Sequence, residues 1–158
     1  MFFRALIAFL VLPGIAGIIL PPLFAAIDPW RNSPIWQGSI LMVIGLMLLL
    51  WCVRDFYVRG KGTLAPWDPP QNLVVVGLYR YMRNPMYVGV IILVGGWALA
   101  CGSPLLVLYV AALSAGFHCQ VVTNEEPWLR SQFADDWEHY RANVDRWVPR
   151  LKPWKGGS

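Results

Sequence analysis

The sequence predicts an all-α integral membrane protein with about four transmembrane helices and a cytoplasmic amphipathic C-terminal tail. Two observations indicate this class. Of the 158 residues, 57% are hydrophobic and only 14% are charged, and the mean hydropathy is +0.49. A soluble domain usually carries about 25% charged residues. The hydrophobic residues also gather in long uninterrupted runs, which is typical of membrane spans. We therefore expect one membrane domain over residues 1–158.

The four apolar runs are the expected spans, and they cover residues 5–27, 35–53, 86–101 and 104–123. A helix needs about 20 residues to cross a bilayer, with a range of roughly 17–25. The first run contains Pro13, Pro21 and Pro22, so we interpret it as a retained, kinked span and not as a signal peptide. The third run is short, and only Gly102 and Ser103 separate it from the fourth. These two runs are therefore predicted to form a helical hairpin.

The charges of the connecting loops predict the orientation. The 54–83 loop has five basic and two acidic residues, the 28–34 loop has one of each, and the 102–103 turn has none. By the positive-inside rule the 54–83 loop faces the cytoplasm. Both termini then face the cytoplasm as well, while Asn32 and Ser103 are expected to be exposed on the opposite side.

The tail, residues 124–158, differs from the rest of the chain. Between residues 124 and 155 it holds six acidic and six basic residues together with several aromatic ones. Apolar side chains recur there at spacings of four, four, three and four, which predicts an amphipathic helix. Such a helix lies on the membrane surface or packs over the cytoplasmic helix ends. The spaced residues are Leu129, Phe133, Trp137, Tyr140 and Val144.

Several kinds of site are not supported by the sequence. The three cysteines form no CxxC pair, and His118 and His139 are too far apart for an HExxH motif. We therefore predict no metal site. The net charge of +4 is small and dispersed, which argues against nucleic acid as a partner. The sequence gives no indication of an oligomeric state.

Polar residues concentrate where the third run begins. The stretch "GLYRYMRNPMYVG", residues 77–89, places two arginines and three tyrosines directly before it. Asn84 and Pro85 suit the N-cap and first turn of a helix. Tyr81 and Tyr87 also suit an interfacial aromatic belt, so a simple membrane anchor is an alternative interpretation of this stretch.

A second polar group follows the fourth run, in "FHCQVVTNEEPW". Glu125 and Glu126 at the C-terminal end of a helix oppose its macrodipole, and carboxylates resist burial at a bilayer. They therefore require an arginine or a cationic ligand, unless this is only a solvated helix end. His118 lies seven residues before Glu125, which places both on one helix face. His118 is either a site residue or a core histidine.

The two polar motifs together resemble the integral-membrane methyltransferases. "RNPMYVG" stands about 40 residues before "EEPWLRSQFADDWEHYRANVDRWVPRLKP", as in isoprenylcysteine carboxyl methyltransferases, phospholipid N-methyltransferases and many bacterial relatives. The resemblance covers roughly residues 40–153, and "GKGTLAPWDPP" at 60–70 is similar to the bacterial branch, which implies the bacterial inner membrane. The matching positions are Arg83, Asn84, Pro85, Tyr87, Gly89, Glu125, Glu126, Leu129, Phe133, Trp137 and Tyr140.

The resemblance implies an S-adenosyl-L-methionine-dependent methyltransferase. It would act on a lipidic or amphiphilic acceptor, a carboxylate or an amine, at the cytoplasmic membrane interface. The implied catalytic residues are Asn84, Tyr87, Glu126 and Arg146. The implied cofactor-binding residues are Gly45, Arg83, Asn84, Pro85, Met86, Tyr87, Gly89, His118, Glu125 and Glu126. The alternative is a non-enzymatic membrane scaffold or partner subunit with the same fold. A small transporter is disfavoured, because the first three spans carry no charge at mid-depth.

The chemistry of these side chains suits that cofactor. Carboxylates accept hydrogen bonds from ribose hydroxyls or an ammonium group, while Arg83 or Arg146 can pair with the methionyl carboxylate. Tyr87 offers an aromatic face to a cation. A carboxylate acceptor needs no base, whereas an amine acceptor must lose a proton, for which Glu126 or His118 is a candidate.

The chain departs from the family pattern at three positions. Asn84 stands where the prenylcysteine enzymes usually carry His, although the phospholipid enzymes share "NPMY". Ala134 replaces a Gly that often follows the Phe. Gly45 matches only the first Gly of a Gly-x-Gly cofactor motif, so a helix-packing role is an equal alternative for it.

Overall fold

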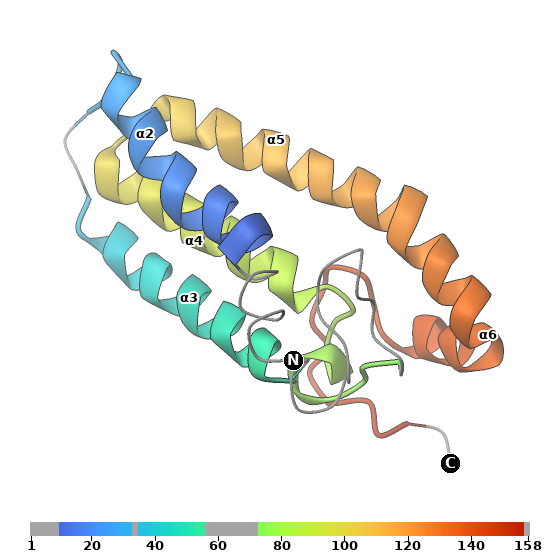
Figure 1. The fold of residues 1–158 in the computed structure, drawn as a ribbon. Coiled ribbons are helices and arrows are strands. Elements are labelled where there is room, and N and C mark those ends of the chain that lie inside the picture. Colours follow the sequence, from blue (N-terminus) through green and yellow to red (C-terminus); the bar gives the residue numbers. More distant parts are fainter. Residues whose placement is uncertain (1–9, 33–34, 56–72, 157–158) are drawn as a thin grey trace.

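The structure, a computed structural model, describes residues 10–32, 35–55 and 73–156. Within these ranges all regular secondary structure is helical, which confirms the all-α class (Figure 1). The elements are the π-helical η1 (Leu10–Ile19), α2 (Leu20–Ile27), α3 (Gln37–Asp55), the 3₁₀ turn η3 (Gly77–Arg80), α4 (Pro85–Cys101), α5 (Pro104–Gln120), the π-helical turn η4 (Val121–Glu125) and α6 (Glu126–Asn143). The "GKGTLAPWDPP" segment lies outside the described residues.

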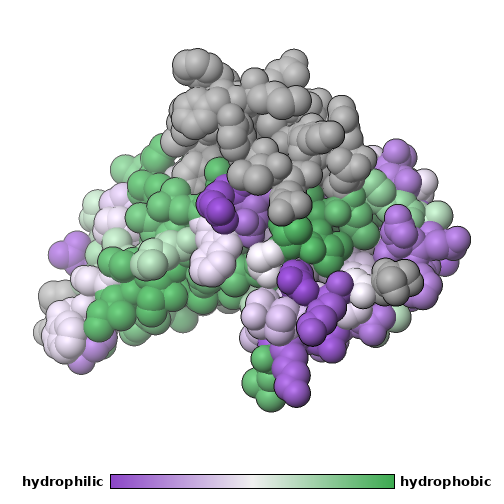
Figure 2. Space-filling model, turned by 90° about the horizontal axis from the view of Figure 1, so that it is seen from below, coloured by the Kyte–Doolittle hydropathy of each residue, from purple (hydrophilic) through white to green (hydrophobic). Residues whose placement is uncertain are grey.

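Two helices of the described chain are long and apolar enough to cross a membrane. They are Gln37–Asp55 and the continuous helix Pro104–Asn143, and the apolar helices Pro13–Ile27 and Pro85–Cys101 are shorter. Figure 2 shows hydrophobic residues over the helical bundle and hydrophilic ones gathered at the end formed by α6 and the C-terminal segment. Large apolar side chains on the bundle, such as Met47 and Leu108, are 65% and 68% exposed. This distribution supports a membrane protein, and the number of spans stays a prediction.

Glycines bring α3 and α4 close together. Gly38 and Gly45 lie seven residues apart on α3, and Gly89 and Gly96 do so on α4, so each pair occupies one helix face. A Cβ atom at Gly45 would lie 2.5 Å from the Leu93 nitrogen and 2.8 Å from the Gly89 carbonyl oxygen. Small residues permit such contact between membrane helices. Gly45 therefore has a packing role, and its predicted cofactor role stays a prediction.

The predicted hairpin of the third and fourth runs is present as α4 and α5, joined by Gly102 and Ser103. Gly102 has a φ of 57°, a left-handed conformation that closes α4. Asp28 accepts hydrogen bonds from the Ser103 hydroxyl and from the Leu105 N–H (3.0 Å), and the Asn32 N–H donates to the Gly102 carbonyl (2.8 Å). The 28–32 loop and the hairpin turn therefore lie at the same end of the bundle. Ser103 is buried, which contradicts its expected exposure, because its hydroxyl caps α5 and bonds to Asp28.

The helix that contains the fourth apolar run does not end with that run at Thr123, and the bounds of the span stay a prediction. The helix continues through the π-helical turn η4 into α6 and bends at Ala134, which has φ 36° and ψ −107° (Figure 1). The residues of the predicted apolar stripe do lie together, but not on one straight helix, because Ala134 has non-helical backbone angles and Val144 follows the last residue of α6. Trp137, Tyr140 and Val144 are buried, and Leu129, Phe133, Leu73, Val75 and Trp154 pack against them. The second half of α6 thus packs on the segment that precedes α4.

Candidate functional site

Three segments that are distant in sequence meet where α4 begins. They are residues 79–84, the helix around residues 117–126, and the C-terminal segment 144–154. Three hydrogen bonds of 2.9 Å join the first and the last: Arg83 N–H to the Asp145 carbonyl, Arg150 N–H to the Tyr81 carbonyl, and Trp154 N–H to the Arg80 carbonyl. The Tyr140 hydroxyl also donates to the Tyr79 carbonyl at 2.6 Å. Backbone hydrogen bonds therefore hold the segment before α4 against the C-terminal segment, and this brings the predicted polar residues together.

A carboxylate with two arginines forms the centre of this region. Glu126 accepts two hydrogen bonds from Arg146, Nε to Oε1 at 2.7 Å and Nη2 to Oε2 at 2.8 Å, and one from Arg83 Nη1 at 2.9 Å. The side chains of Arg83 and Glu126 are only 9% and 13% exposed. Burial by itself would raise the pKa of Glu126, but the hydrogen bonds from Arg146 and the two positive charges hold that pKa below its ordinary value. Glu126 is therefore ionised at neutral pH.

The arginine partners expected for the glutamate pair are present. One of the two reasons for expecting them, the helix macrodipole, is wrong. We expected Glu125 and Glu126 at the C-terminal end of a helix, opposed by its macrodipole. In the structure the helix does not end there, because η4 leads directly into α6. The two residues thus lie within a continuous helix, where end effects of the macrodipole are small. Burial of the Glu126 charge is what requires the arginines.

Arg83 has hydrogen-bonding capacity left over. Its guanidinium lies over the Trp137 ring, 5.3 Å from the centroid, which is a cation–π distance. Its Nε is buried and finds no acceptor among the residues that the structure describes. A buried donor without an acceptor is unfavourable by about 1–3 kcal/mol. A ligand that brings an acceptor oxygen to this position would remove that penalty.

Glu125 has different surroundings. The Tyr87 hydroxyl donates a hydrogen bond to its carboxylate. The Tyr87 ring lies 4.5 Å from that of Phe117 and 6.4 Å from that of Trp147. Trp147 Nε1 in turn donates to His118 Nδ1 at 3.3 Å. Burial, together with the charge of Glu126, raises the pKa of Glu125 although the bond from Tyr87 opposes this. His118 thus joins the site through Trp147.

Asn84 occupies the predicted N-cap position of α4, with Pro85 at the first helical position. Its side chain makes no capping hydrogen bond, however, and this part of the prediction is wrong. The Asn84 amide instead donates to the Arg146 carbonyl at 3.2 Å. The C-terminal segment supplies this acceptor, and the amide nitrogen can only donate. Asn84 therefore holds the backbone of Arg146, whose side chain binds Glu126.

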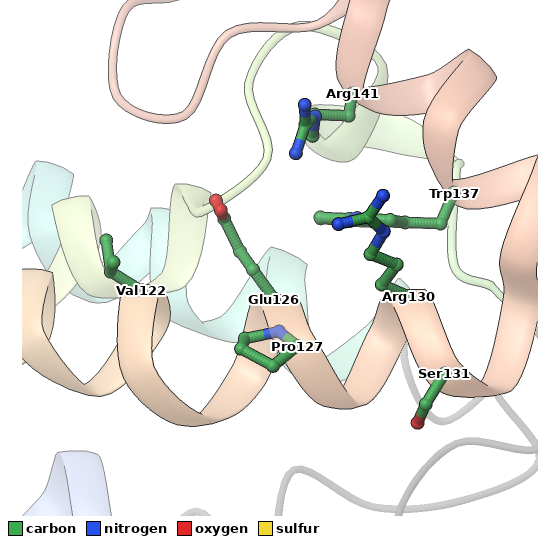
Figure 3. A pocket seen from close by; sticks show the side chains of 7 residues that line it. All are labelled: Val122, Glu126, Pro127, Arg130, Ser131, Trp137 and Arg141. Carbon is green, nitrogen blue, oxygen red and sulfur yellow. The ribbon is translucent and has the colours of Figure 1, made fainter.

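A cavity of about 380 Å³ opens in the bend of α6. Figure 3 shows Glu126 and Arg130 reaching into it from the helix before the bend, with Trp137 and Arg141 on the part after it. Arg130 Nε contacts Glu138 Oε1 at 3.0 Å across the bend. Small-molecule pockets are about 300–1,000 Å³ in volume, and this cavity lies at the lower end of that range. Its lining is Val122, Glu126, Pro127, Arg130, Ser131, Trp137 and Arg141.

The predicted site residues separate into two groups in space. The structure brings together Arg83, Asn84, Tyr87, His118, Glu125, Glu126 and Arg146. The others pack between helices: Gly45 and Gly89 in the α3–α4 contact, buried Pro85 at the start of α4, and Met86 against the cluster around Cys52 and Tyr79. Their site roles stay predictions.

Sequence reasoning missed several residues of the site, namely Phe117, Arg130, Trp137, Arg141 and Trp147. Trp137 was recognised as part of the apolar stripe and of the family pattern, but its contact with Arg83 was not expected. Trp147 lies beyond the helix, where no periodicity marks a partner. Arg80, which has no counterpart in the family motif, is also not a free surface residue, because its Nε donates to the Trp154 carbonyl at 2.6 Å.

Fold and site together define a small helical membrane protein with a buried arginine–glutamate cluster at one end of its bundle. Residues 33–136 match the family model described as phospholipid methyltransferase, and the chain belongs to this family.

Two curated relatives are protein-S-isoprenylcysteine O-methyltransferases. The chain is 36% identical to that of Schizosaccharomyces pombe over 79 residues, which is 50% of this chain and 34% of the relative. It is 26% identical to that of Dictyostelium discoideum over 122 residues, which is 73% of this chain and 49% of the relative. The chain thus spans half or less of the length of these relatives. No solved structure matches it significantly.

Proposed function

We propose that the protein is an S-adenosyl-L-methionine-dependent methyltransferase that acts on a lipidic or amphiphilic acceptor. The reaction takes place at the cytoplasmic face of a membrane, which in a bacterium is the inner membrane. The observation that carries the proposal is the buried ion-pair cluster in which Arg83 and Arg146 bind Glu126, a residue that lines the α6 cavity. Membership of the phospholipid methyltransferase family supports it. So does the apolar helix α4, which begins two residues after Arg83.

The donor groups of the site fit the cofactor. S-adenosylmethionine carries a carboxylate, an ammonium group, a ribose diol, an adenine ring and a sulfonium cation. The Arg83 Nε–H, which has no acceptor among the described residues, suits the carboxylate. Trp137 offers a flat ring at the cavity wall, and Glu126 offers carboxylate oxygens there. When bound, the cofactor supplies a methyl group already activated by the positive sulfur.

The residues of this chain then act mainly by positioning. Glu126 fixes two guanidinium groups with three hydrogen bonds, so that their charges are preorganised. Asn84 and the backbone of Arg83 hold the C-terminal segment in place. The aromatic rings of Tyr87, Phe117 and Trp147 provide an apolar boundary that excludes water.

Glu125 is a better candidate for the proton acceptor than Glu126 or His118. Glu126 is occupied by two arginines and has a lowered pKa, whereas burial raises the pKa of Glu125. A carboxylate with a raised pKa is the better proton acceptor near neutral pH. His118 Nδ1 already accepts a bond from Trp147. Glu125 is thus the candidate base for an amine acceptor, and a carboxylate acceptor needs none.

The experiment is a titration of the purified protein with S-adenosylhomocysteine, followed by calorimetry. Glu125→Gln and Glu126→Gln should each weaken binding by about ten- to hundredfold, because charge-assisted hydrogen bonds contribute roughly 1.5–3 kcal/mol. Asp136→Asn, an exposed acidic residue of α6, is the matched control and should bind like the wild type.

Absence of saturable binding to the wild type would favour the non-enzymatic scaffold instead. Wild-type affinity in both glutamine variants would leave the pair without a binding role. Transfer of a labelled methyl group to fractions of a membrane lipid extract would then identify the acceptor as a carboxylate or an amine, since methyl esters are cleaved by mild base and methylamines are not.

A further inference from the structure

The C-terminal segment that closes the site also carries an exposed apolar and basic surface. Leu151 is 101% exposed and Val148 is 65% exposed. Between residues 146 and 155 there is no acidic residue, while Arg150, Lys152 and Lys155 are basic. We call residues 148–155 the basic segment. Leu151 therefore has no packing partner within the described chain, and with Val148 and the three cations it forms a surface that is both apolar and basic.

The depth of the basic segment follows from its backbone contacts. Arg150 N–H donates to the Tyr81 carbonyl and Trp154 N–H to the Arg80 carbonyl, both at 2.9 Å. Tyr81 and Arg80 stand only four and five residues before Pro85, the first residue of the apolar helix α4. The basic segment is therefore fixed at the level where α4 enters the membrane, and this is the level of the lipid headgroups.

We propose that the basic segment docks on the anionic headgroups of the same leaflet that α4 enters. Leu151 and Val148 would reach the boundary of the acyl chains, and the three cations would lie among phosphate and carboxylate groups of the lipids. Charge complementarity and depth both favour this partner. Interfacial segments bind in this way, by apolar burial together with attraction to anionic lipids.

This contact has a consequence for the site, because the basic segment follows Arg146 and Trp147 directly. Lipid contact at residues 148–155 restrains the chain that presents Arg146 to Glu126. The docking itself does not depend on the proposed methyl transfer, and its test needs no activity measurement.

The test measures depth by fluorescence in lipid nanodiscs. Leu151→Cys is introduced into a variant without the three native cysteines, labelled with a small environment-sensitive dye, and reconstituted with brominated phospholipids as quenchers. Leu108→Cys, 68% exposed on α5, is the control inside the bilayer. Asp135→Cys, exposed next to the bend of α6, is the control in water.

We expect a loss of fluorescence at position 151 comparable with that at position 108. The loss should be greater with phosphatidylglycerol than with phosphatidylcholine alone, and Lys152→Glu combined with Lys155→Glu should remove this dependence on lipid charge. Quenching at 151 as weak as at 135 would overturn the proposal. It would also be overturned if the dye at 151 were shielded from the lipid quencher and the unlabelled Leu151→Cys variant were oxidised to a disulfide with a second copy of the chain, since the surface would then join two copies.

Discussion

Replacement of Arg83 by lysine separates a binding site from a membrane anchor. If the stretch 77–89 only anchors the chain, Arg83→Lys should be nearly silent, because either cation can extend to the headgroups. The structure indicates a more specific role. The Arg83 side chain is 9% exposed, it donates to Glu126 at 2.9 Å, and it stacks over Trp137 at 5.3 Å. Lysine keeps the charge but loses the planar fork and the Nε donor.

The magnitude follows from what lysine cannot replace. Toward the ligand it is the hydrogen bond from the Arg83 Nε, and a charge-assisted hydrogen bond contributes roughly 1.5–3 kcal/mol. Lysine retains part of the attraction, and Arg146 keeps its two bonds to Glu126. A net loss of about 1.5 kcal/mol remains, equivalent to a roughly tenfold weaker binding of S-adenosylhomocysteine.

The assay is calorimetric titration of the purified protein, with thermal unfolding measured in parallel to show that the fold is intact. The control is Arg54→Lys, because the Arg54 side chain is 73% exposed and lies 3.4 Å from Asp55. Arg80 is unsuitable, because it bonds to the Trp154 carbonyl. Equally small effects at Arg83 and Arg54 would refute the reasoning and return the stretch to the anchor interpretation.

Three further outcomes are expected. The pKa of Glu126 is lowered from its ordinary value of 4.5, so its ion pairs should stabilise the fold at pH 4.5 and above, and this stabilisation should be lost as the pH falls below 4.5. Glu126→Gln should abolish this part of the dependence of the free energy of unfolding on acid pH. Ala134→Gly should raise the free energy of unfolding by about 1 kcal/mol, measured by thermal unfolding, because the φ of 36° strains alanine but not glycine; an unchanged or lower stability would contradict this. In a cysteine-free background, Asn32→Cys and Lys155→Cys should react with membrane-impermeant reagents from opposite sides of the membrane, and labelling from one side would exclude the proposed topology.

The helices could be predicted because their signals are local. The runs expected at 86–101 and 35–53 correspond to α4 (Pro85–Cys101) and α3 (Gln37–Asp55), since hydropathy and turn residues act within each segment. The bend at Ala134 could be inferred only through the family, where a Gly often stands at this position. The periodic stripe itself continues through the bend without any sign of it.

The partners in the site could not be predicted from spacing. Arg83 and Glu126 are 43 residues apart and Arg146 is 20 residues beyond Glu126, so their contacts depend on the return of the chain after α6. The sequence indicated that a buried carboxylate pair needs a cation, but several arginines were available. The cap at Asn84 failed for the same reason, because the side chain is oriented by the hydrogen bond that its amide nitrogen donates to the Arg146 carbonyl of the C-terminal segment.

The two adjacent glutamates have different partners and different surroundings. Successive residues of a helix project about 100° apart, so Glu125 and Glu126 cannot face the same partner. Glu125 meets Tyr87 of α4, and Glu126 meets the two arginines. Their environments push the pKa values in opposite directions, up for Glu125 and down for Glu126. Carboxylates separated in this way commonly divide proton transfer from charge stabilisation. In the proposed function, Glu125 would be the proton acceptor on the side of the membrane helices, where an amphiphilic acceptor would lie. Glu126 is the ionised carboxylate on the side of the cavity that binds the two arginines.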